Sequence, residues 1–146
     1  MLYSRPCEYA IRAAAYLARQ PQSRLVSVRE VARAEGIPVP FLARILHQLA
    51  RADLLLSRKG PGGGFQLARP ARQISLRDVV AVIDGLNGLQ QCAVGLARCS
   101  DEMPCPLHDM WKELRRRIAG YLEGISLAEM GRAVERKRAF LAVAKE

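Results

Sequence analysis

The sequence has few aromatic residues and no long hydrophobic run. Aromatics make up 5% of the 146 residues, so Leu, Ala, Val and Ile must fill the interior, and hydrophobic residues at 50% are plentiful enough to do so. No stretch has the apolar length that crosses a bilayer, and the first residues lack the apolar segment of a signal peptide. We therefore expect a cytoplasmic protein with no membrane association.

Signatures of catalysis are also missing. The sequence contains no recognisable nucleophile–base pair, carboxylate dyad or dinucleotide fingerprint. Its glycine-rich segment, residues 60–64, lacks the Lys-Ser/Thr pair that a phosphate-binding loop requires. These absences argue against an enzyme.

Acidic residues are scarce relative to basic ones. The chain has 14 Asp and Glu against 23 Lys and Arg, which gives a formal net charge of +9. An excess of this size favours a polyanionic partner, most commonly nucleic acid. A basic protein without such a partner remains the plainer interpretation of charge alone.

Local patterns predict a mainly α fold with a small β-hairpin. Ser-x-x-acid capping boxes at Ser27, Ser75 and Ser126 mark three helix starts. The expected helices cover about 5–19, 28–36, 40–52, 76–85, 106–124 and 127 onward. Residues 54–57 and 65–67 are expected as strands joined by the glycine-rich tip.

Three helices followed by a hairpin form the order of a winged helix-turn-helix. Such a module places its third helix in the major groove of DNA and its hairpin, the wing, against the backbone or minor groove. Arg and Gln can read bases, basic and Gly residues of a wing suit phosphates, and a helix N-terminus also favours a phosphate. A solvated helix face and a tight turn are the plainer interpretations of the same residues. The expected DNA-binding residues are Ser27, Arg29, Pro40, Arg44, His47, Gln48, Arg51, Arg58, Lys59, Gly60, Gly62 and Gly63.

Cys92, Cys99 and Cys105 fall in an irregular stretch after the hairpin and its following helix. Thiolates bind iron–sulfur clusters or zinc. Zinc fingers usually carry close Cys-x-x-Cys pairs, which this stretch lacks, whereas wide spacing suits wrapping a bulkier inorganic centre. Cys105 lies next to Pro106 at the start of the predicted long helix, where the helix dipole favours a thiolate.

Three features together resemble the family of the iron–sulfur cluster regulator (IscR) and the nitric-oxide-sensing repressor (NsrR), which are winged-helix transcription regulators. The features are residues 9–13 in the first helix, residues 60–65 in the wing and the three-cysteine loop, and the similarity runs from Leu2 to about Ala128. The resemblance implies a homodimer that binds palindromic, double-stranded promoter DNA and senses redox state, nitric oxide or iron–sulfur status. Pro40 and Ala43 stand where the best-known member has polar, base-reading side chains, so its operator preference does not transfer.

The resemblance also suggests the fourth cluster ligand. Cys92, Cys99 and Cys105 leave one coordination position, and His108, three residues after the last cysteine, is the leading ligand for it. An exposed polar residue in a first helical turn is the plainer interpretation of His108. In some relatives an acidic residue from the partner's first helix serves instead, and here Glu8 occupies that region beside Cys7, which we expect to be a small helix residue. A two-iron (2Fe–2S) cluster is favoured, and a four-iron (4Fe–4S) cluster also fits.

The expected organisation has three parts. Residues 1–84 form the winged helix-turn-helix, residues 85–105 the cluster-binding loop, and residues 106–146 a dimerisation helix and a C-terminal helix. The apolar residues on the long helix that are expected to pack within the chain or across a twofold axis are Trp111, Leu114, Ile118, Tyr121 and Leu122.

Two other functions fit the same residues. A regulator of this fold without a cluster would be switched by oxidation of its cysteine thiols or by a small ligand. A zinc-dependent structural or RNA-binding module would also use three cysteines. Metal analysis and the colour of protein purified without oxygen separate these hypotheses.

Overall fold

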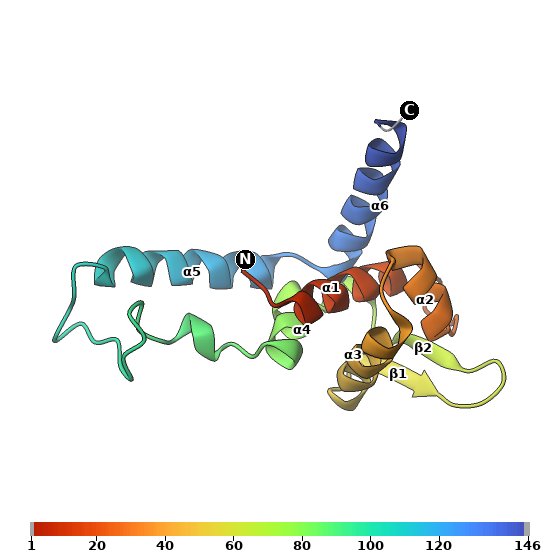
Figure 1. Ribbon diagram of the computed structural model, residues 1–146, viewed down its shortest axis with the longest axis horizontal. Coiled ribbons are helices and arrows are strands. Elements are labelled where there is room, and N and C mark those ends of the chain that lie inside the picture. Colours follow the sequence, from red (N-terminus) through yellow and green to blue (C-terminus); the bar gives the residue numbers. More distant parts are fainter. Residues whose placement is uncertain (1, 145–146) are drawn as a thin grey trace.

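The computed structural model describes residues 2–144. Over this range the chain is mainly helical with one two-stranded antiparallel sheet (Figure 1). The elements are α1 (Arg5–Ala18), α2 (Val28–Glu35), α3 (Val39–Arg51), β1 (Leu55–Arg58), β2 (Gly64–Leu67), η1 (Ala71–Gln73), α4 (Leu76–Ile83), η2 (Asn87–Leu89), α5 (His108–Gly124) and α6 (Leu127–Val143). This order confirms the predicted winged helix-turn-helix fold. Among the described helices, none has both the length and the apolar character needed to cross a membrane.

The N-terminal helices pack around one hydrophobic core. The inner face of α3 is formed by Leu42, Ile45, Leu46 and Leu49, all buried. Gly36 caps the end of α2, and its φ of 63° is the left-handed conformation that glycine adopts readily. A short turn then leads into α3, so that α2 and α3 form the helix-turn-helix.

Two of the three predicted capping boxes are complete. The Ser75 and Ser126 hydroxyls accept the backbone N–H groups of Asp78 and Glu129, and these acids accept the serine N–H groups in return. At Ser27 the prediction is half wrong. Its hydroxyl accepts the Glu30 N–H at 3.2 Å, but Glu30 does not complete the box.

Glu30 is drawn away from Ser27 by stronger partners. Its carboxylate accepts two hydrogen bonds from the Arg24 guanidinium, at 2.9 and 2.8 Å, and one from the Tyr16 hydroxyl at 2.8 Å. Charge-assisted bonds of this kind outweigh a single backbone donor. These bonds, with Arg24 leading, lower the pKa of Glu30 from its ordinary value.

Backbone hydrogen bonds join the wing to the segment directly before α2. β1 and β2 pair with Arg58 opposite Gly64, each strand within one residue of its predicted bounds. Val26 joins β2 through two backbone hydrogen bonds with Phe65, of 2.9 and 2.8 Å. Gly64 permits this approach, since a Cβ there would lie 2.4 Å from the Val26 carbonyl oxygen. The wing is therefore oriented by the helix-turn-helix itself.

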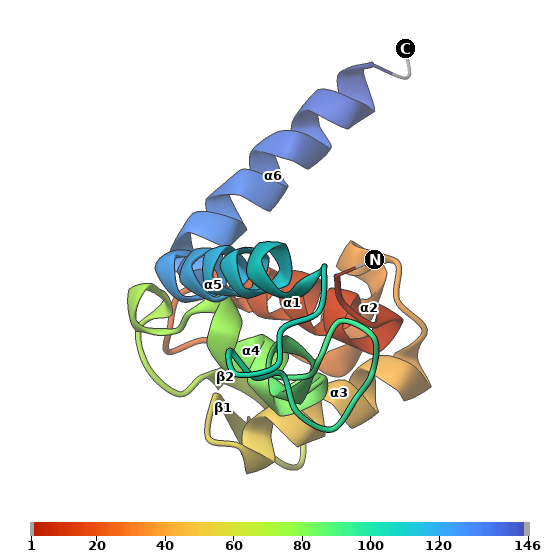
Figure 2. The ribbon, with the colours of Figure 1, turned by 90° about the vertical axis from the view of Figure 1, so that its left-hand side faces the viewer.

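The cysteine loop and the wing lie at opposite ends of the molecule. α5 runs along the long axis and carries the loop at its start, as Figure 1 shows, while α6 leaves the body at a steep angle, as Figure 2 shows. Leu122 at the end of α5 and Leu127 at the start of α6 belong to the same core as the N-terminal helices. The packing of the N-terminal helices therefore continues into α5 and α6, beyond the predicted boundary at residue 105. The division of the chain at that residue stays a prediction.

Candidate cluster site and nucleic-acid interface

One face of α5 holds the cysteine loop. The indole Nε1–H of Trp111 donates to the Gln91 carbonyl at 2.8 Å, and the Arg115 guanidinium donates to the Gln90 carbonyl at 3.2 Å. The Arg115 guanidinium also lies over the Trp111 ring, 5.9 Å from its centroid. These contacts anchor the start of the loop directly before Cys92.

His108 and Cys99 meet at the centre of this region. His108 is 5% exposed, and its Nδ1 lies 3.2 Å from the Cys99 Sγ. Its Nε2 lies 2.7 Å from the Asp101 Oδ1. The interpretation of His108 as an exposed polar residue is therefore wrong, because its ring is buried between a thiol and a carboxylate.

Positive charge surrounds this contact. Lys112 donates to both oxygens of Asp101, at 2.9 and 3.0 Å, and the Arg115 Nη2 lies 4.0 Å from the Cys99 Sγ. The hydrogen bonds from Lys112 and then from His108 lower the pKa of Asp101 to about 2. The same pairing raises the pKa of Lys112. The site thus offers cations to a negatively charged ligand next to its thiol.

The other two loop cysteines, which precede and follow Cys99 in the sequence, are also half-buried. The carbonyl oxygen of Cys105 accepts the His108 N–H at 3.0 Å, so α5 begins three residues after the cysteine, slightly later than predicted. Within residues 2–144, no three His, Cys, Asp or Glu side chains lie close enough together to hold a metal ion. Of the four predicted ligands, the structure brings Cys99 and His108 into contact, and neither Cys92 nor Cys105 joins them in a metal-binding group within the described residues.

Cys7 and Glu8 lie on the first turn of α1, away from the outer part of the loop in Figure 1. The Cys7 side chain is fully buried, and this burial, with the negative charge of Asp84, raises its pKa to about 12. A thiol with such a pKa is neither a nucleophile nor a ready ligand. Glu8 is part-exposed, with its carboxylate 3.9 Å from the Arg5 Nε. Its role as a ligand supplied to a partner chain, which the resemblance implies, stays a prediction.

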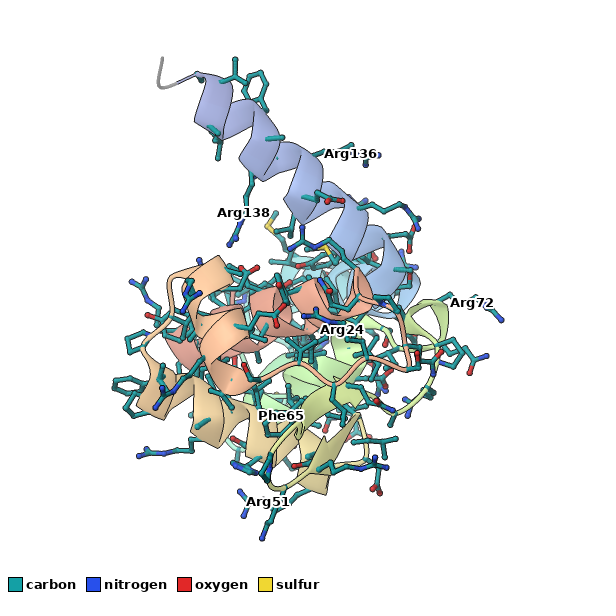
Figure 3. The ribbon with its side chains drawn as sticks, turned by 90° about the vertical axis from the view of Figure 1, so that its right-hand side faces the viewer. Arg24, Arg51, Phe65, Arg72, Arg136 and Arg138 are labelled. Atoms are coloured by element: carbon teal, nitrogen blue, oxygen red, sulfur yellow. The ribbon has the colours of Figure 1, made fainter. Side chains whose placement is uncertain are left out.

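The expected DNA-reading face of α3 is exposed. Arg44, His47 and Arg51 are exposed along the helix, and Arg58 and Lys59 are exposed in the wing. Figure 3 shows Arg51 reaching out from the lower edge of the molecule, where the hairpin also lies. The His47 ring packs edge-on against the buried Phe65, with centroids 5.3 Å apart. This contact ties the outer face of α3 to the wing.

Gln48 differs from the rest of that face. It is half-buried, and its Nε2 donates to the Val82 carbonyl on α4 at 3.2 Å. Its amide is thus already used within the chain. Pro40 and Arg29 are exposed in the first turns of α3 and α2. The Ser27 hydroxyl accepts the hydrogen bond that caps α2.

The backbone packing of the hairpin explains one of the wing glycines. A Cβ on Gly63 would lie 2.2 Å from the Arg58 carbonyl oxygen, so the hairpin requires glycine there. Gly60 and Gly62 lie at the exposed tip, with open space around them. The tight-turn interpretation thus accounts for Gly63 without any DNA contact.

Four residues of the loop site were not predicted to act there. They are Asp101, Trp111, Lys112 and Arg115. Lys112 and Arg115 follow His108 by four and seven residues, the spacing of one helical face, and this signal was available in the sequence. The role of Asp101 depends on how the loop folds back and has no local signal.

The apolar face of α5 is divided. Leu122 is buried and Ile118 packs against the core, in agreement with packing inside the chain. Met110, Leu114 and Tyr121 remain exposed. Exposed apolar side chains on a long helix are typical of a surface that a partner covers.

Comparison with known proteins places this architecture in context. Residues 3–133 match the Rrf2 family model, which is described as an iron-dependent transcriptional regulator. A putative HTH-type transcriptional regulator of Aquifex aeolicus is 34% identical over 132 residues, which cover 89% of this chain and 91% of that protein. The HTH-type transcriptional regulator IscR of Photobacterium profundum is 32% identical over 124 residues, 85% of this chain and 72% of that protein. The solved structure of CymR, the global cysteine regulator of B. subtilis, is similar in fold, with a TM-score of 0.76 at 17% identity over 91% of this chain and 98% of that one.

Proposed function

We propose, from the premise that this chain belongs to the Rrf2 family of transcriptional regulators, that its binding to promoter DNA is set by an iron–sulfur cluster on Cys92, Cys99, Cys105 and His108. Membership in a family of regulators makes the chain a regulator and not an enzyme. The observation that carries the cluster proposal is the burial of His108 against Cys99, with Nδ1 and Sγ 3.2 Å apart. A DNA-binding regulator works where promoter DNA is, so the proposal places the protein in the cytoplasm.

The donor set fits an iron–sulfur cluster. Three thiols, which are soft ligands, and one imidazole, which also binds iron, come from a single loop and helix start and suit such a cluster. Binding requires that Cys92 and Cys105 move toward the Cys99–His108 pair. The loop permits this because its residues between Cys92 and Cys105 are mostly exposed and carry little core packing.

A two-iron cluster is the form we infer, and the separation of the two central ligands is compatible with it. With metal–sulfur and metal–nitrogen bonds of about 2.3 and 2.0 Å, two ligands on one tetrahedral metal lie about 3.5 Å apart. The observed 3.2 Å is close to this separation. A two-iron cluster with four protein ligands takes two per iron, whereas a four-iron cluster takes one per iron.

The residues around the ligands then act as follows. When bound, the cluster supplies a centre that oxidation, nitric oxide or iron scarcity can alter. Arg115 and Lys112 place positive charge beside the thiolates, and Trp111 fixes the loop entrance. An imidazole ligand exchanges and protonates more readily than a thiolate, which suits a sensor.

α5 connects this site to the winged helix-turn-helix, here called the reading head. Its first residue is His108, its end contributes Leu122 to the core, and its 17 residues span about 25 Å. We infer that a shift of the first turn would change how α5 packs against α4. The exposed Met110, Leu114 and Tyr121 support a second copy of the chain as the partner, so that two reading heads meet a palindromic site.

On the DNA side, each winged helix contributes two kinds of contact. Arg44, His47 and Arg51 of α3 face the major groove, and Arg58 and Lys59 of the wing hold phosphates. Ser27, Arg29, Pro40 and the wing-tip glycines are proposed to approach the backbone. Gln48 contributes after release from Val82, or otherwise positions α3 against α4.

The test is anaerobic reconstitution with ferrous iron and sulfide. We expect about two irons and two sulfides per chain, visible absorption, and a change in affinity for promoter fragments that the protein itself enriches from genomic DNA. Cys99→Ser should abolish the absorption and the change in affinity, and Cys7→Ala, the matched control outside the loop, should keep both. Protein that takes up no iron, or equal affinity of loaded and metal-free protein for every fragment, would overturn the proposal.

A cluster-free thiol switch is the second candidate. The observation that favours it is the contact of Cys99 with both His108 and Arg115, which suits a reactive thiol. If reconstituted protein stays colourless and a disulfide between loop cysteines alters DNA affinity, this candidate replaces the first. Zinc without iron in the purified protein would indicate the structural module instead.

A further inference from the structure

A chain of three polar contacts runs from Lys112 through the proposed ligand His108 to Cys99. The Lys112 ammonium holds both oxygens of Asp101, at 2.9 and 3.0 Å. One of these oxygens lies 2.7 Å from the His108 Nε2. The opposite ring nitrogen, Nδ1, faces the Cys99 Sγ at 3.2 Å.

The chemistry of these contacts selects one form of the imidazole. A carboxylate with a lysine on it can only accept, so Nε2 must carry the hydrogen that bridges to Asp101. In the neutral ring Nδ1 then holds the free lone pair. Because the ring is buried and held at one edge, that lone pair points toward the cysteine that shares the site. Metal-ligating histidines commonly donate their other N–H to a carboxylate in this way.

We propose that Asp101 is a positioning residue of the cluster site, which keeps the His108 hydrogen on Nε2 and presents Nδ1 as the ligand atom. This inference rests on the cluster site proposed above. It goes beyond that site by naming the coordinating nitrogen and by giving a role to Asp101 and Lys112, which bind no iron. Asp101 is 71% exposed, so its place in the loop is explained by these contacts and not by packing.

A simpler role for Asp101 would be to tether the loop to α5 through Lys112. The two roles differ in what they require of the histidine ring. A tether loosens all loop contacts alike, whereas a positioning residue changes the state of one imidazole. The chain contains two histidines, so His47 on α3 serves as an internal reference in the same spectra.

The first experiment uses metal-free protein labelled with nitrogen-15 at histidine. Two-bond proton–nitrogen spectra at alkaline pH, with His47→Gln for assignment, report which ring nitrogen carries the hydrogen. We expect His108 as a single Nε2–H form in the wild type and a second form in Asp101→Ala, with His47 unchanged. An Nδ1–H form of His108 in the wild type would overturn the proposal.

The second experiment uses the protein reconstituted with ferrous iron and sulfide. Pulsed electron paramagnetic resonance of the reduced cluster should detect one strongly coupled histidine nitrogen in the wild type. Asp101→Ala should broaden or split this coupling and speed iron loss to a chelator by about 10-fold or more. Glu102→Ala, a neighbouring exposed carboxylate of the same loop, is the matched control and should behave as wild type. Asp101→Asn, which keeps an acceptor for Nε2–H without the charge, should fall between the two.

The outcomes separate this inference from the function on which it rests. Failure of all variants and the wild type to take up iron removes the cluster, while the nitrogen spectra still report on Asp101. If Asp101→Ala takes up iron, and its nitrogen coupling and iron-loss rate match those of Glu102→Ala, the cluster proposal stands and the positioning role is overturned.

Discussion

The buried carboxylate of Glu35 supports a quantitative prediction about how α6 is held. Glu35 ends α2, and its side chain has no exposed surface. The Arg138 guanidinium on α6 donates to this carboxylate and, at 2.6 Å, to the Ala34 carbonyl. Arg19 of α1 lies 3.8 Å from the other carboxylate oxygen. Figure 3 shows Arg138 pointing from α6 toward α2, while Arg136 points away.

Replacing Arg138 with Ala removes the main partner of that carboxylate. Breaking a buried ion pair by deleting one member costs about 3–5 kcal/mol. Arg138 is 37% exposed and Arg19 remains, so solvent screening and the second cation reduce the expected loss to about 2–3 kcal/mol. For a chain of this size that corresponds to a fall in Tm of about 6–12 °C. Arg136→Ala, an exposed arginine on the same helix, should stay within about 0.5 kcal/mol of wild type.

The pH dependence of this loss tests the reasoning. Burial raises the pKa of Glu35, against the opposing effect of Arg138, so the ionised carboxylate disfavours the folded state. A group whose folded pKa is raised loses its contribution to stability as pH rises through that pKa. Removal of Arg138 raises the pKa further, so the deficit of Arg138→Ala should be largest near neutral pH and shrink as the solution is acidified.

Urea unfolding followed by circular dichroism, at about pH 7.5 and about pH 5.5 and at one protein concentration, measures both effects. Because the unpaired carboxylate is the expected source of the loss, Glu35→Leu combined with Arg138→Leu should recover most of the stability at the higher pH. An Arg138→Ala deficit below about 0.5 kcal/mol, or one that does not change with pH, would refute the argument.

Three further predictions test other parts of the molecule. Under native conditions iodoacetamide should modify the loop cysteines within minutes and leave Cys7 unmodified in mass spectra, because Cys7 is buried with a raised pKa; labelling of Cys7 at the loop rate would contradict this. Lys59→Ala should weaken binding to all DNA sequences alike and lower the slope of log affinity against log salt by about one in fluorescence anisotropy, and a change at one base position would argue against a phosphate contact. Gly64→Ala should disorder the wing through its clash with the Val26 carbonyl, seen as loss of amide protection in hydrogen exchange, whereas Gly62→Ala at the open tip should retain that protection.

Helix starts and the wing could be predicted because their signals are local. The Ser75 and Ser126 capping boxes place both partners within four residues, so the sequence alone contains the geometry. The box at Ser27 failed for the opposite reason. Tyr16, on another helix, and Arg24 compete for Glu30, and neither competitor is visible in a four-residue motif.

The same distinction applies to the two candidate sites. The exposed arginines of α3 follow from helical periodicity, but the bond from Gln48 to Val82 joins residues 34 apart and needs the packed structure. At the loop, the residue types and the resemblance identified His108, while its burial came from the fold. The pairing of Glu35 with Arg138 spans 103 residues, and its partners could not be matched from charge patterns alone.

The two ends of the molecule differ in how much their conformation depends on the core, and this difference supports the proposed function. The helix-turn-helix is fixed by buried side chains, by the backbone bridge from Val26 to the wing and by the ion pair between Arg138 of α6 and Glu35. The loop is held by a few hydrogen bonds from one face of α5, with its cysteines half-buried. Under the proposed function, ligand binding would reorder the loop without unfolding the winged helix-turn-helix, and α5, which belongs to both ends, would carry the change. Loss of the Arg138–Glu35 ion pair should consequently alter stability more than iron uptake. Loss of Asp101 should alter iron binding more than stability.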